Sequence, residues 1–232
     1  MKGFALILLC VAVAVQGRST AVQTVASNKA VAALGENPWL VHLRLAVATS
    51  GFLNSCAGSL ISQSWVLTTG SCVENARFIW VRYGAVNVVN PSLVTETSVV
   101  RVFPDWAPGR VETDVALVSI NRVVQFNENI APVSLASSLD LPESTNFCGF
   151  GALEDGPGEV LSCFDVTLSG AGEISFVAQS EDGQTTQFDN GAPLVSDGVQ
   201  IGILVSGESG TFIGPAVFRD WIQIIIGETL SA

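Results

Sequence analysis

The chain has 232 residues, with 10 basic and 21 acidic side chains and a formal net charge of −11. Nucleic acids and anionic membranes are bound through clustered cations, so we expect neither as a partner. A chain of this length can bury the core of one large all-β domain or of two small barrels.

Residues 1–17 have the pattern of a secretory signal peptide. Lys2 precedes an apolar run from Phe4 to Val15, and Gly17 provides a small-residue exit. This order of basic, apolar and small residues is typical of export, and the run is shorter than the roughly 20 apolar residues of a membrane span. A buried N-terminal helix is the alternative. We therefore expect a secreted, extracellular protein.

Four cysteines remain outside the expected signal peptide, which contains Cys10. An even number in an exported chain indicates two disulfides. Metal binding is the alternative, but the chain has no CxxC pair and only one histidine, so we expect no metal and no other cofactor. The four cysteines are Cys56, Cys72, Cys148 and Cys163.

Short β-rich segments recur along the chain, with Gly, Pro, Asn and Asp between them, which predicts a sandwich or a barrel. A helix is predicted at 217–226, where Trp221 and Ile225 lie one turn apart and Gly227 follows. A break near 127–134 divides the chain into two halves. The predicted strands are 39–47, 64–69, 78–84, 97–103, 114–120, 159–168 and 199–207.

Several sequence blocks resemble segments of the trypsin/chymotrypsin serine proteases, in the family's order, over roughly residues 30–227. GENPWLVHL (35–43) resembles the family's GxxPWxVxL opening, and 56–72 resembles the segment in which CGGSLI leads to WVLTAAHC. TDVALVSI (113–120) resembles NDIALIKL. DNGAPLV (189–195) resembles the end of GDSGGPLV, and GILVSG (202–207) is similar to GIVSWG.

The resemblance implies an all-β fold of two six-stranded antiparallel Greek-key barrels with a C-terminal helix. The trypsin-like domain would span 35–227, with barrels at about 35–130 and 131–227, after an N-terminal segment at 18–34. It also implies a Cys56–Cys72 disulfide that brackets the catalytic histidine loop. No family bridge matches Cys148 and Cys163, but adjacent antiparallel strands bring Cα atoms to about 5 Å, which suits a disulfide.

Catalysis in this family needs a serine nucleophile, a histidine base and a carboxylate that orients the histidine. In this chain the histidine position is Ser71 and the serine position is Asn190, while Asp114 keeps the acid position. Phe188 replaces a glycine whose N–H belongs to the oxyanion hole. Loss of either nucleophile or base costs about a million-fold in turnover in a related triad, so we expect a catalytically inactive homologue.

Further positions depart from the family. The floor of the specificity pocket is Gln184, so we do not expect the cation selectivity of trypsin. No Arg or Lys lies directly before residues 25–28, where activation cleavage would occur, and the nearest basic residues are Arg18 and Lys29. Asp189, which would pair with the new terminus, is therefore expected to be solvent-reached, hydrogen-bonded or raised in pKa. His42 alternates with Arg44 along one strand, which favours a surface histidine over a catalytic one.

These departures predict a non-catalytic homologue that binds protein or peptide ligands, as a decoy for protease inhibitors or as a cofactor for an active protease. A serine endopeptidase with residual or non-standard activity and a secreted structural protein are the alternatives. Outside the signal peptide the chain has one lysine and eight arginines. Because arginine stays charged at high pH, adaptation to an alkaline, trypsin-rich lumen such as an insect gut is one hypothesis.

Overall fold

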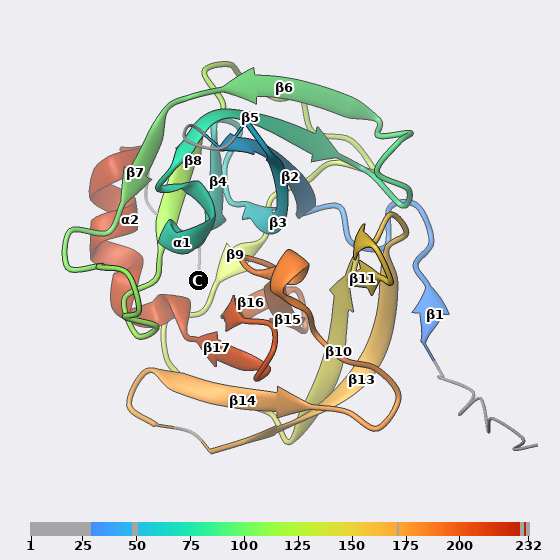
Figure 1. The fold of residues 1–232 in the computed structure, drawn as a ribbon. Helices are drawn as coiled ribbons and strands as arrows, with labels where there is room; N and C mark the ends of the chain where they lie inside the picture. The colour runs from blue at the N-terminus through green and yellow to red at the C-terminus, as the bar shows by residue number, and fades with distance from the viewer. Residues whose placement is uncertain (1–28, 48–50, 171, 228–229, 231–232) are drawn as a thin grey trace, which may run out of the picture.

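The computed structural model describes residues 29–47, 51–170, 172–227 and 230. Two curved antiparallel β-sheets lie one above the other in Figure 1, and helix α2 (Arg219–Ile226) packs beside them. The predicted all-β fold of two barrel-like sheets with a C-terminal helix is confirmed. The signal peptide and the expected activation segment at 25–28 lie outside the described residues.

The first sheet has seven strands in the order β6-β5-β2-β3-β4-β8-β7, one more than predicted, and no pairing joins β6 to β7 within the described residues. Along β2, Val41, Leu43 and Leu45 are almost fully buried because alternate residues face the barrel interior. The strands are β2 (Leu40–Val47), β3 (Leu53–Leu60), β4 (Trp65–Thr68), β5 (Ala76–Tyr83), β6 (Leu93–Thr97), β7 (Val100–Val102) and β8 (Ala116–Ser119).

The second sheet contains a closed ring of six strands, since β13 pairs with both β10 and β14. Phe147, Phe176 and Phe212 fill its interior, and the rings of Phe147 and Phe176 both contact Phe212. The ring consists of β10 (Ser144–Gly149), β13 (Ser162–Ser169), β14 (Ser175–Gln179), β15 (Pro193–Ser196), β16 (Val199–Ser206) and β17 (Thr211–Ile213).

Short elements complete the architecture. Strand β1 (Ala30–Val31) pairs with β13, so the first described strand joins the second sheet rather than the first. Strand β9 (Ser134–Leu135) runs parallel to β16. The remaining elements are α1 (Gly70–Val73), the hairpin of β11 (Ala152–Leu153) and β12 (Gly156–Pro157), and the 3-10 helices η1 (Gln187–Asp189) and η2 (Pro215–Phe218).

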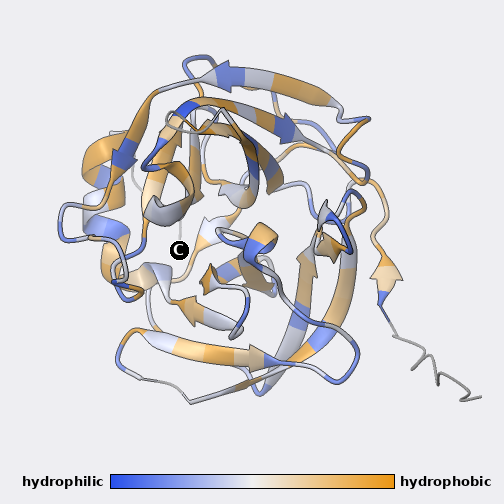
Figure 2. Cartoon of the chain, viewed as in Figure 1, coloured by the Kyte–Doolittle hydropathy of each residue, from blue (hydrophilic) through white to orange (hydrophobic). Residues whose placement is uncertain are grey.

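Helix α2 is amphipathic, as its spacing predicts. Ile222 is fully buried and Ile224 is exposed, and Figure 2 shows apolar and polar segments alternating along the helix and the strands. The Phe103 ring makes edge contacts with Phe218 and Trp221 at centroid distances of 5.0 and 5.4 Å. The helix ends at Gly227, whose φ of 69° is the left-handed conformation that glycine favours.

Both predicted disulfides are present. Cys56 in β3 is bonded to Cys72 in α1, which ties this short helix to the first sheet. Cys148 and Cys163 are directly opposite residues of β10 and β13, with Cα atoms 4.1 Å apart. The second bridge therefore reinforces a pair of neighbouring strands.

Candidate functional site

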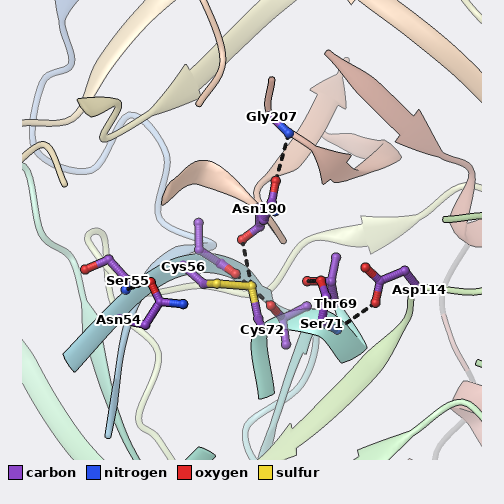
Figure 3. Close-up of a disulfide and its surroundings, with 11 residues drawn as sticks. Asn54, Ser55, Cys56, Thr69, Ser71, Cys72, Asp114, Asn190 and Gly207 are labelled. Atoms are coloured by element: carbon purple, nitrogen blue, oxygen red, sulfur yellow. Dashed lines mark hydrogen bonds between the residues drawn. A yellow bond between two sulfur atoms is a disulfide. The ribbon is translucent and has the colours of Figure 1, made fainter. Parts of the chain in front are cut away.

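Three segments from distant parts of the sequence meet beside the Cys56–Cys72 disulfide. They are α1 with Ser71, the residues before β8 with Asp114, and η1 with the following Asn190 (Figure 3). The Ala57 N–H in β3, next to Cys56, donates to the Asn190 carbonyl at 2.9 Å and holds Asn190 beside the disulfide. The fold thus brings together the three positions that the sequence singled out.

Asp114 holds the backbone of α1 in place. Its carboxylate accepts a hydrogen bond from the Ser71 N–H at 2.8 Å, while the Ser71 hydroxyl lies 3.3 Å from the Thr69 hydroxyl. Asp114 is buried, and burial raises the pKa of its carboxyl although hydrogen bonds from Ser71 oppose the shift. Ser71 is therefore paired with Asp114 through its backbone, and Asp114 is a hydrogen-bonded acid before a strand.

Asn190 is engaged on the opposite side of the site. Its side-chain Oδ1 accepts a hydrogen bond from the Gly207 N–H at 2.8 Å. Its carbonyl oxygen lies 3.5 Å from Cys72 Sγ; this is a sulfur–oxygen contact, because a disulfide sulfur has no hydrogen to donate. Among the described residues, no hydrogen bond joins the Asn190 side chain to Ser71 or Asp114.

The backbone N–H groups of the two residues after Phe188 are directed at carbonyl oxygens of the same turn. Phe188 is the middle residue of η1, where the Asp189 N–H donates to the Thr186 carbonyl at 2.9 Å. The Asn190 N–H points to the Gln187 carbonyl at 3.4 Å. An oxyanion hole needs donors aimed at a substrate oxygen, and the Asn190 donor is directed elsewhere.

The walls of the expected specificity pocket touch each other. A Cβ added to Gly207 would lie 1.8 Å from the Thr186 carbonyl oxygen, and the Thr185 hydroxyl donates to the Gly207 carbonyl at 2.6 Å. Gln184, the expected floor, is exposed. The backbones of Thr186 and Gly207 therefore pack directly against each other, and Gln184 instead lines a cavity with Thr185 and Glu208. Sequence analysis missed this closure, since it depends on a contact between segments 21 residues apart.

Asp189 is satisfied entirely from within the second barrel. Its carboxylate accepts hydrogen bonds from the Gly151 N–H at 2.8 Å, the Thr186 N–H at 2.9 Å and the Thr186 hydroxyl at 2.8 Å. Burial raises the pKa of Asp189, although these bonds oppose the shift. The expected hydrogen bonding and raised pKa are confirmed, whereas solvent access is wrong because only 1% of the residue is exposed.

His42 is buried, which corrects the expectation of a surface histidine. Only 2% of the residue is exposed, and its ring makes an edge contact with the Phe150 ring at 5.1 Å. The side chain projects from the outer face of β2, as the alternation predicts, but Phe150 and the segment that follows it cover that face. Burial, together with Arg82 and Arg44, lowers the pKa of His42 to about 3. His42 lines a separate cavity that does not include Ser71 or Asn190.

Comparison with known proteins identifies the family. The family model of trypsin matches residues 27–223. The chain belongs to the trypsin family. This trypsin-family protein is 26% identical over 216 residues to Trypsin 5G1 of Aedes aegypti, with 81% of each chain covered. It is 29% identical over 228 residues to the Factor V activator of Macrovipera lebetinus, with 86% of each covered.

Solved structures show the same fold. The structure of HL collagenase superimposes with a TM-score of 0.76 at 24% identity, covering 88% of this chain and 99% of that one. Within the described residues, no cluster of three or more His, Cys, Asp or Glu side chains could hold a metal ion. No helix in the described part of the chain has the length and apolarity needed to cross a membrane. Relatives come from a mosquito and a viper, and also from a bird, Gallus gallus.

Proposed function

We propose that the protein is a secreted, non-catalytic member of the trypsin family that binds a protein or peptide ligand. The main support is the side chain of Asn190, which stands at the nucleophile position and bonds to Gly207 instead of to a base. Ser71 stands at the base position and has no imidazole. A hydroxyl and a carboxamide cannot replace the base and the nucleophile of the triad.

The remaining histidine does not offer a substitute base. A general base works best when its pKa lies near the operating pH, and the pKa of His42 is about 3. Two disulfides support export, because disulfides persist in oxidising compartments.

Between the two roles, a cofactor for an active protease fits better than an inhibitor decoy. An inhibitor that mimics substrate inserts a side chain into the specificity pocket, and the backbones of Gly207 and Thr186 pack against each other there. A cofactor instead uses exposed surface and does not need an open pocket. The protein would then bind the active protease through its surface loops, and the residues at the triad positions would only help to hold the structure together.

The test combines a peptidase assay with functional reconstitution. Purified protein is incubated with mixed peptide substrates and, in parallel, with an active trypsin-family protease from the same secretion. We expect no cleavage by the protein alone and a change in the kcat/KM of the active protease when it is added. Turnover by the protein alone that disappears in an Asp114→Ala variant would overturn the proposal.

A competition arm separates the two roles. A protein inhibitor of trypsin is mixed with active trypsin in the presence of excess trypsin-family homologue. Unchanged inhibition is expected for a cofactor with a closed pocket. Relief of inhibition would instead establish the decoy role and show that Gly207 and Thr186 separate on binding.

A further inference from the structure

A cavity of about 1080 Å³ lies on the outer face of the first sheet, separate from Ser71 and Asn190. Strands β2, β3, β5 and β6 form its floor, and the β11–β12 hairpin with the adjoining residues 158–159 forms the opposite wall. The outer face of a barrel strand is usually exposed to solvent. Here the covering segment turns it into a pocket of the size that binds small molecules.

Three nitrogen-bearing side chains lie together on this floor. His42 in β2 is directly opposite Arg82 in β5, and Arg44 is two residues along β2 on the same face. Opposite and diagonal neighbours on adjacent strands are close enough for long side chains to interact. Partial burial, and then the neighbouring guanidinium of Arg44, lower the pKa of Arg82. This concentration of positive charge occurs in a chain whose net charge is −11.

These groups lack anionic partners within the part of the chain that the structure describes. Arg44 Nη1 donates to the Ser55 hydroxyl at 3.0 Å. Neither Arg44 nor Arg82 forms an ion pair with a described residue, and Arg82 has no hydrogen bond to one. Nδ1 of the buried His42 also has no hydrogen-bond partner among them. Buried polar atoms are nearly always paired, and His42 Nδ1 is the one buried atom of this set without a partner among the described residues. Arg44 and Arg82 are partly exposed, so their free donors are open to an external acceptor.

The surrounding walls are apolar, and the rim is acidic. Trp80 stands beside Arg44 on the floor, and its Nε1 is already bonded to Glu96 at 2.8 Å. Exposed carboxylates on the covering segment line the opposite edge and would repel a polyanion. The apolar lining residues are Leu53, Val88, Val89, Pro91, Val94, Leu153 and Pro157, and the rim acids are Glu154, Asp155 and Glu159.

We propose that this cavity binds a small organic monocarboxylate with an apolar body. The carboxylate accepts hydrogen bonds from the guanidinium groups of Arg44 and Arg82, next to the ring of His42. The apolar body lies against Trp80 and the valine and proline walls. Rim acids exclude ligands with several negative charges, so polyphosphates and nucleic acids do not compete.

The test uses His42 as a single reporter. Because the chain has one histidine, protein without a histidine tag and labelled with nitrogen-15 in its imidazole gives NMR signals from one side chain. Decanoate and 4-phenylbutyrate represent aliphatic and aromatic acids, and 4-phenylbutyramide is the uncharged match for the second. We expect at least one carboxylate to bind with a Kd below about 1 mM and to shift the His42 signals. The amide should bind at least about tenfold more weakly, because it lacks the charge-assisted hydrogen bonds.

Variants locate the site. Arg82→Gln and Arg44→Gln should each weaken carboxylate binding by about tenfold or more. Arg101→Gln removes an exposed arginine of β7 outside the cavity and should leave binding unchanged. Circular dichroism confirms that each variant is folded. The proposal is overturned if neither acid binds, if the amide binds as well as the acid, or if Arg101→Gln weakens binding as much as Arg82→Gln.

Discussion

Acid is expected to destabilise this protein through His42. The pKa of the imidazole falls from its ordinary value of 6.5 to about 3, first because it is buried and then because Arg82 and Arg44 lie nearby. A group whose pKa is lower in the folded state binds its proton more readily in the unfolded state. Its contribution to stability is therefore fully present above pH 6.5 and is lost as the pH falls toward 3.

The pKa change sets an upper limit on the size of this effect. At about 1.4 kcal/mol for each tenfold change in proton affinity, a fall from 6.5 to about 3 corresponds to at most about 5 kcal/mol. Acidification from about pH 7 to about pH 4 should lower the free energy of unfolding by about 3 kcal/mol through His42. That loss is large beside the roughly 5–15 kcal/mol that typically stabilises a folded protein.

The assay compares urea unfolding of the wild type and a His42→Leu variant across this pH range. Leucine keeps an apolar contact with Phe150 but does not titrate. Asp114 and Asp189 have raised pKa values, so their contributions change in the opposite direction and weaken as the pH rises. Because both proteins contain these carboxyls, the difference between the two unfolding free energies isolates His42.

The expected result is that the wild type loses stability relative to His42→Leu as the solution is acidified. Parallel curves over the whole range would refute the reasoning. An NMR titration of the single imidazole provides the independent measurement, and a midpoint near pH 6.5 would show that the ring is not held in a buried environment.

Three further predictions concern the second barrel and the residues at the triad positions. Replacing Cys148 and Cys163 together by serine should cost about 3 kcal/mol in chemical unfolding, as expected for a disulfide closing a loop of 15 residues. Gly207→Ala should cost about 2–3 kcal/mol, because its new Cβ would clash with backbone. A Ser71→His, Asn190→Ser double variant should remain inactive on peptide substrates, since Thr186 still packs against Gly207 and the N–H of residue 190 still points to the Gln187 carbonyl.

Controls for these changes come from the same chain. Gly172→Ala is the match for Gly207→Ala, because a Cβ at Gly172 meets only ordinary contacts at 3.5 Å; equal losses in the two variants would contradict the closed wall. Unchanged stability without the Cys148–Cys163 bridge would show that strand pairing alone holds β10 to β13. Peptide cleavage by the double variant would show that the cleft opens readily.

Local sequence patterns were sufficient for much of the fold. Strand β2 was predictable because Val41, Leu43 and Leu45 alternate with polar residues, and α2 because of its helical spacing. The positions of Ser71 and Asp114 followed from blocks that resemble the family. Strands β10, β14 and β17 were not singled out, since they span only six, five and three residues.

What escaped sequence analysis depends on packing between segments. Alternation placed His42 on the outer face of β2, but the segment that covers this face comes more than 100 residues later. Likewise, nothing near Asp189 in the sequence indicates that Gly151 will donate to its carboxylate. The closure at Gly207 arises from a contact with Thr186 that only the folded chain defines.

The internal hydrogen bonds to Asp189 have a consequence for how the protein is regulated. In relatives that are switched on by a cut, the freed ammonium must swing inward to neutralise the matching carboxylate. Here the uncharged donors of Gly151 and Thr186 already hold the carboxylate by hydrogen bonds, so its position does not depend on a freed terminus. How much of the polypeptide the cell releases, rather than when it is nicked, would then determine its biological effect.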